Sequence, residues 1–117
     1  MTVNDYIRKN RSIDTFLTPT ITCKSGLRIS IQASEYHYCI PKESFAFPYV
    51  AVEIGYPTKA IPELMEYAQD ASNPTETVYG FVPVSVVDKI IEDNGGVEEW
   101  KRTHLILSVN YTGKIGM

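Results

Sequence analysis

The residues with the widest chemical repertoire lie together in the stretch Tyr36-His37-Tyr38-Cys39, with Lys42 three residues further on. An imidazole beside a thiol is the pairing of a nucleophilic cysteine site, and a histidine and a cysteine two residues apart in a strand share a face, as two metal ligands would. Neither site is complete, because the sequence has no C-x-x-C or H-x-x-x-H spacing and no identifiable orienting group or oxyanion loop. We therefore expect no metal and no cofactor, and a buried, inert thiol at Cys39.

Other catalytic signatures are equally sparse. The phosphate-loop patterns G-x-x-x-x-G-K and G-x-G-x-x-G are absent, and the sequence Asp-Asn-Gly-Gly at 93–96 follows a predicted helix, so it is a helix stop and not a phosphate cradle. Carboxylate pairs such as Glu98-Glu99 are typical of solvated helix faces. The sequence therefore predicts a protein that is not an enzyme. One alternative stays open, a small phosphodiesterase or lyase, which would need His37 and His104 to converge.

The remaining candidate for a functional feature is a set of aromatic residues interleaved with basic and amide side chains. Aromatic faces stack on nucleobases, which contributes about 1–3 kcal/mol per base, and arginine offers forked donors to phosphate. Arg28 and Gln32, on the wet face of a strand beside such rings, would suit a nucleotide. The alternative is that the same rings form the core. The side chains in question are Tyr36, His37, Tyr38, Phe45, Phe47, Tyr49, Tyr79 and Phe81.

The periodicity of apolar residues predicts the strands and helices that carry these side chains. Leu27, Ile29 and Ile31 alternate with polar residues after a turn at Gly26, which predicts a hairpin with one buried and one wet face. Residues 35–41 could continue its second strand. Together the elements predict an α+β fold, a mainly antiparallel sheet with two or three helices packed on one side. The other predicted strands are 49–57, 77–84 and 104–111, the loop is 41–48, and the helices are 3–10 capped by Thr2, 61–71, and one from Pro83 to the glycines at 95–96.

Length and composition bound the class of protein. The chain has 117 residues, 44% hydrophobic and 21% charged, so we expect a single compact domain over residues 1–117. No apolar run of about 18 residues is present to span a membrane. The charged start at Met1 lacks the apolar core of a signal peptide, so we expect a complete chain in the cytoplasm. In that reducing compartment, Cys23 and Cys39 are expected to be free thiols.

The net charge of −3 is unevenly distributed. Residues 1–42 hold six basic and three acidic residues, residues 43–99 hold two basic and eleven acidic, and residues 100–117 hold three basic. If the two ends meet, they form a local site for an anion. The alternative is that these charges only solubilise the surface. The acidic body argues against binding along duplex nucleic acid, which needs many phosphate contacts.

Four motifs taken together resemble a group of small phage and prophage proteins. They are a C-[KR]-x-G-[FL] hairpin at 23–27, an S-[IV]-Q-A-S…H-Y-C-x-P segment at 30–41, a V-E-[IV]-G-[FY]-P strand at 52–57, and a Y-G-[FYW]-V-P helix entry at 79–83. The resemblance covers roughly residues 20–97. On these motifs the chain resembles the first Thoeris anti-defence family.

This resemblance implies a phage sponge in the host cytoplasm. Such proteins sequester cyclic ADP-ribose-type signals made by TIR-domain immune proteins without cleaving them, bind cyclic oligonucleotides at a second kind of site, and form oligomers. A chain this small has little concave surface of its own, so we expect a homo-oligomer with sites between subunits. The alternative is a small inhibitor that binds a host defence protein directly. Candidate ligand-binding residues, chosen on physical grounds, are Arg28, Gln32, His37, Tyr38, Lys42, Phe81 and Arg102.

Overall fold

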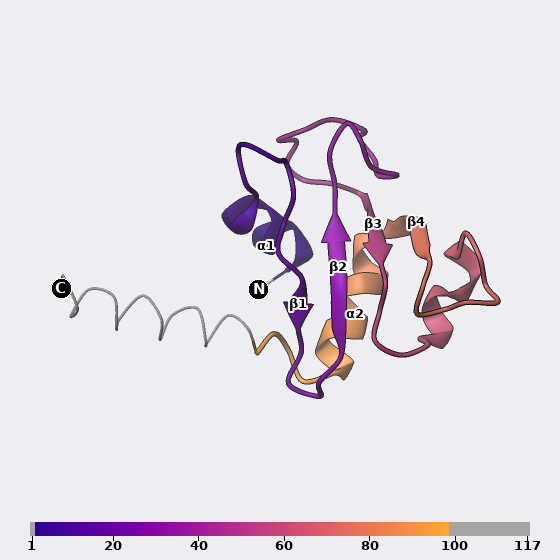
Figure 1. Ribbon diagram of the computed structural model, residues 1–117. Helices are drawn as coiled ribbons and strands as arrows, with labels where there is room; N and C mark the ends of the chain where they lie inside the picture. The colour runs from indigo at the N-terminus through magenta and orange to yellow at the C-terminus, as the bar shows by residue number, and fades with distance from the viewer. Residues whose placement is uncertain (1, 99–117) are drawn as a thin grey trace, which may run out of the picture.

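The computed structural model describes residues 2–98 of the chain (Figure 1). Within this range a four-stranded antiparallel sheet has the order β1-β2-β3-β4 and is accompanied by helices, which confirms the predicted α+β fold. Arg102, His104 and the strand predicted at 104–111 lie outside the described residues. The elements are α1 (Val3–Asn10), β1 (Ile21–Thr22), β2 (Arg28–Gln32), β3 (Ala51–Gly55), the 3-10 helix η1 (Pro62–Tyr67), β4 (Val78–Pro83) and α2 (Val84–Asp93).

The predicted hairpin of β1 and β2 is confirmed. The two strands pair antiparallel, with Ile21 opposite Ile29. The turn between them uses Gly26 at φ +98°, a conformation that glycine adopts without steric cost. Ile29 and Ile31 are buried while Arg28 is exposed, so the period of two in the sequence separates a core face from a wet face.

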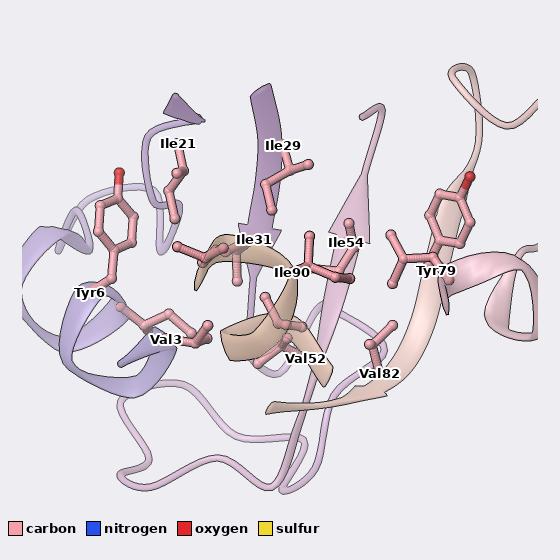
Figure 2. Close-up of a cluster of buried hydrophobic side chains, with 14 of the residues drawn as sticks. Val3, Tyr6, Ile21, Ile29, Ile31, Val52, Ile54, Tyr79, Val82 and Ile90 are labelled. Atoms are coloured by element: carbon pink, nitrogen blue, oxygen red, sulfur yellow. The ribbon is translucent and has the colours of Figure 1, made fainter. Parts of the chain in front are cut away.

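The core lies between the sheet and the two α-helices (Figure 2). Helix α1 contributes Val3 to this core, and α2 contributes Ile90. A hydrogen bond joins the helices, because the Val3 amide donates to the Asp88 carboxylate at 2.8 Å. That bond satisfies one of the free amides at the start of α1. The predicted cap is also confirmed: the Thr2 hydroxyl accepts from the Asp5 amide and the Asp5 carboxylate accepts from the Thr2 amide.

The stretch 35–41 forms turns and does not continue β2, so that part of the sequence prediction is wrong. The Ser34 hydroxyl accepts the Tyr36 N–H at 3.0 Å, and the Ser34 carbonyl accepts the His37 N–H at 3.2 Å. These local bonds replace the ladder bonds that a strand would make. Pairing resumes only at Ile40, which forms an isolated bridge to the start of β3.

The helix predicted over 61–71 is shorter and tighter than expected. It is the 3-10 helix η1, in which the Leu64 amide donates to the carbonyl three residues earlier. The chain then leaves the helix because the Gln69 amide donates to the Val78 carbonyl at 2.9 Å. Pairing with β4 therefore ends the helix before its sequence pattern does.

After α2 the chain turns back along β1. Gly95 and Gly96 have φ of +86° and +87°, so they stop the helix as predicted. The Lys24 amide donates to the Gly96 carbonyl at 3.0 Å, and the Glu98 amide donates to the Thr22 carbonyl at 2.7 Å. This short segment thus pairs with the edge of β1.

Within residues 2–98, no helix combines the length and the apolar character needed to cross a membrane. Cys23 and Cys39 are both buried free thiols. Burial raises the pKa of the Cys23 thiol, so it stays protonated at neutral pH.

Candidate functional site

Four of the sequence-predicted site residues come together: His37, Tyr38, Lys42 and Phe81, here called the Lys42 cluster. The Lys42 amine donates to the His37 carbonyl at 3.1 Å and lies 5.6 Å from the centroid of the Tyr38 ring. The Tyr38 and Phe81 rings are tilted against each other with centroids 5.8 Å apart. The lysine thus lies beside one exposed ring, which packs against a second exposed ring that Phe81 contributes from β4.

Main-chain bonds and a close contact fix the Lys42 cluster on the sheet. The Tyr38 amide donates to the Glu53 carboxylate on β3 at 3.0 Å, and the Tyr38 carbonyl accepts from the Phe81 amide at 3.0 Å. Gly80 permits this approach, because a Cβ at that position would lie 3.2 Å from the Tyr38 Cβ. The cluster therefore lies directly on β3 and β4.

The surroundings of His37 favour its neutral form. Its Nδ1 lies 2.6 Å from the Ser34 hydroxyl, which also accepts the Tyr36 amide at 3.0 Å. Burial lowers the pKa of His37, and the nearby Arg11 and Lys42 charges lower it further, against the opposing effect of Glu53. Ser34 is fully buried, so the pair holds a turn and does not present a nucleophile.

Cys39 is buried, as the sequence predicts. Its thiol donates to the Ser34 carbonyl at 3.2 Å, and burial raises its pKa above the usual value. A protonated, enclosed thiol is a poor nucleophile. Within residues 2–98, no group of three histidine, cysteine, aspartate or glutamate side chains is placed to hold a metal ion.

Arg28 and Gln32 do not form one site with each other. They are four residues apart on β2, so their Cα atoms are separated by about 13 Å. The Gln32 side chain is engaged with Thr18: its Nε2 donates to the Thr18 carbonyl at 2.9 Å and its Oε1 accepts the Thr18 amide at 3.0 Å. Gln32 therefore fastens the chain before β1 to β2, and Arg28 is exposed at the other end of the strand.

A pocket of about 430 Å³, which the sequence did not predict, lies where the end of α1 meets the loop between β2 and β3. Figure 1 shows the segments after α1 and after β2 meeting at one end of the sheet. Two guanidinium groups face rings there: the Arg8 Cζ is 4.6 Å from the Phe47 centroid, and the Arg11 Cζ is 5.4 Å from the Phe45 centroid. We call it the arginine pocket; its lining residues are Ile7, Arg8, Arg11, Ile13, Phe45, Ala46 and Phe47.

The two arginines of the pocket differ in how they are held. The Arg11 Nη1 donates to the Tyr49 hydroxyl at 3.1 Å, and its Nη2 donates to the Ala33 carbonyl. Among the described residues, the Arg11 Nε is the buried side-chain nitrogen that has no hydrogen-bond partner. Arg8 is exposed and makes a loose ion pair with Asp5 at 3.8 Å. The pocket thus has one fixed cation and one adjustable cation.

The aromatic rings around the arginine pocket are exposed, and two of the residues that carry them have a strained backbone. Phe45 and Phe47 are 57% and 51% exposed, although large apolar side chains are usually buried. Phe16 packs edge-on against Phe45 with centroids 5.3 Å apart, and its centroid lies 6.0 Å from that of Tyr36. Phe16 and Phe45 have φ of +61° and +64°, where a residue with a side chain is strained by about 1–2 kcal/mol. Such outliers cluster at functional sites.

A signal for this pocket does exist in the sequence. Arg8 and Arg11 are three apart at the end of a predicted helix, so they share a side of it. Phe45 and Phe47 flank Ala46 in the predicted loop. What the sequence lacks is any sign that these two segments meet.

Comparison with known proteins adds no family assignment. No protein-family model matches the chain, and neither a curated protein nor a solved structure matches it.

Proposed function

We propose that this protein is a phage anti-defence protein that binds a cyclic ADP-ribose-type immune signal and sequesters it without cleaving it. The observation that carries the proposal is the arginine pocket, in which two guanidinium groups and two exposed phenylalanine rings surround about 430 Å³. The resemblance over residues 20–97 supports the identity of the ligand.

The chemistry of the arginine pocket suits a phosphorylated ring. Exposed aromatic faces stack on a nucleobase. Arg11 donates one Nη1 hydrogen and one Nη2 hydrogen within the protein, so its second Nη1 and Nη2 hydrogens, together with Arg8, are the donors that phosphate oxygens would accept. The volume is within the range of about 300–1,000 Å³ that small-molecule pockets occupy.

The same pocket offers nothing that would cleave its ligand. Its lining consists of isoleucine, arginine, phenylalanine and alanine, so it contains no nucleophile and no general base. The closest polar side chains hold the arginines themselves: Asp5 pairs with Arg8 at 3.8 Å, and the Tyr49 hydroxyl accepts from Arg11 at 3.1 Å. Binding without chemistry is the activity that this composition supports.

The direct test is a retention assay. The purified protein is incubated with cyclic ADP-ribose isomers and with cyclic oligonucleotides, free ligand is removed by filtration, and the bound fraction is released by denaturation and identified by mass spectrometry. We expect an intact cyclic ADP-ribose-type molecule. A depleted signal with a new product would mean an enzyme, and signals that all pass through unchanged would reject the proposal in favour of a host protein as target.

A pair of variants locates the site. Arg8→Gln removes the exposed cation of the pocket, and we expect it to weaken retention about tenfold, the loss of one charged hydrogen bond. Arg28→Gln makes the same change on the wet face of β2, and we expect it to retain ligand like the wild type. Equal losses would place the ligand elsewhere.

We also propose that the protein is a homo-oligomer. Light scattering on the eluting peak of a size-exclusion column measures its mass in solution, and a monomer mass of 13.2 kDa would reject this part of the proposal.

A further inference from the structure

Tyr49 lies beneath the arginine pocket and is 2% exposed. Its hydroxyl takes part in three hydrogen bonds: it accepts from the Arg11 Nη1 at 3.1 Å and from the Ala46 amide at 3.2 Å, and it donates to the Glu43 carbonyl at 2.6 Å. A phenol has one donor hydrogen and two acceptor lone pairs, so its hydrogen-bonding capacity is fully used.

These three bonds join the two walls of the pocket. Arg11 follows α1, whereas Glu43 and Ala46 belong to the loop that carries Phe45. One oxygen atom thereby fixes the position of the guanidinium and of the ring-bearing loop relative to each other. The Tyr49 ring adds a second contact, since its centroid lies 5.5 Å from the Arg11 Cζ.

The main chain of Tyr49 is held separately. The Asn4 Nδ2 donates to the Tyr49 carbonyl at 3.0 Å, and the Asn4 Oδ1 accepts the Tyr49 amide at 2.7 Å. Neither bond involves the hydroxyl. Removing the hydroxyl alone therefore leaves the residue anchored in the core and changes only what it positions.

We propose that the Tyr49 hydroxyl is the positioning group of the arginine pocket, which sets Arg11 to meet an anionic group while a planar ring lies against Phe45. The ligand class is therefore a planar ring joined to a phosphate. This proposal rests on the proposed function for the identity of the ligand, but the positioning of Arg11 has its own test. A cation that is already fixed loses less freedom on binding, so its placement raises affinity.

The test is Tyr49→Phe compared with Tyr79→Phe. The Tyr79 hydroxyl is also on a buried residue and donates to a main-chain carbonyl, that of Pro74, at 2.5 Å, but it contacts none of the pocket residues named above. Calorimetry measures the affinity for the retained nucleotide and, separately, the affinity for adenosine, a probe that has the ring without phosphate. We expect Tyr49→Phe to weaken binding of the nucleotide about tenfold or more and binding of adenosine less than twofold. Tyr79→Phe should change neither affinity.

A second readout needs no ligand. The Arg11 Nε–H is buried, so we expect it to exchange slowly enough with water to be observed by NMR, and Arg11→Lys assigns its signal. We expect Tyr49→Phe to accelerate its exchange at least tenfold and Tyr79→Phe to leave it unchanged. Unaltered exchange, or a nucleotide affinity equal to that of the wild type, would overturn the positioning role. A wild type that retains no nucleotide would reject the proposed function instead, and the exchange comparison would still decide the role of Tyr49.

Discussion

The arginine pocket and the Lys42 cluster use the same kinds of side chain and differ in how the cation is held. Each contains a phenylalanine that is about half exposed and has a positive φ, Phe45 in the pocket and Phe81 in the cluster. In the pocket, Arg11 bonds to a buried hydroxyl. In the cluster, Lys42 bonds to a carbonyl on a surface turn. The two regions therefore share their residue types, and what differs between them is the anchoring of the charged group.

The largest expected effect is a loss of nucleotide affinity on substituting Phe45 but not Phe81. Phe45→Gly removes a stacking ring, and we expect the retained nucleotide to bind about tenfold more weakly, the low end of the 1–3 kcal/mol per stacked base. Its free energy of unfolding should change by less than about 1 kcal/mol, because glycine relieves the positive φ. Calorimetric titration and urea unfolding measure the two quantities.

Phe81→Gly is the matched control for that prediction, since Phe81 has φ of +55° and is 48% exposed. We expect its nucleotide affinity to stay within twofold of the wild type. If both glycine variants lose affinity equally, the Lys42 cluster contacts ligand and the contrast between the regions fails.

A smaller effect is expected from Gly80→Ala, which disturbs only the Lys42 cluster. The added methyl would lie 3.2 Å from the Tyr38 Cβ, and Tyr38 has little room to yield because both its amide and its carbonyl are bonded. Overpacking of this kind costs about 1 kcal/mol, which urea unfolding would detect. We expect the Gly80→Ala variant to retain nucleotide like the wild type. A large loss of retention would implicate the Lys42 cluster in binding.

The smallest effect concerns pH. The pKa of His37 is lowered in the folded protein, chiefly by burial, so the unfolded chain takes up a proton first as pH falls below about 6.5. We therefore expect stability to be fully present above that pH and to decline below it.

His37→Gln should lose that part of the pH dependence. Urea unfolding at pH 7.5 and 5.5 compares the two proteins, and His104, present in both, cancels in the comparison. Parallel pH dependences would show that His37 does not titrate differently in the folded state.

Local patterns predicted much of the fold. The alternation at Ile29 and Ile31 fixed the hairpin, and the apolar stripe after Pro83 gave α2, because each signal lies within a few residues. The predicted strand 49–57 is shorter in the structure: β3 begins at Ala51, and Val50 before it is exposed. The register of one strand end depends on its partners and not on its own sequence.

The candidate site was harder to predict. His37, Tyr38 and Lys42 could be grouped from sequence because they lie within six residues of each other. The arginine pocket could not, since the Arg11–Tyr49 hydrogen bond joins positions 38 residues apart. Periodicity reports which face of an element is buried, and it carries no information about which loops meet.

The short segment that follows α2 has a consequence for the behaviour of the protein at high concentration. An unpaired strand edge is a template on which a second molecule can add a strand and begin aggregation. At β1 the Thr22 carbonyl and the Lys24 amide are already bonded to Glu98 and Gly96 of the same chain. The two-stranded hairpin is thereby protected, at that point of its edge, against edge-to-edge association.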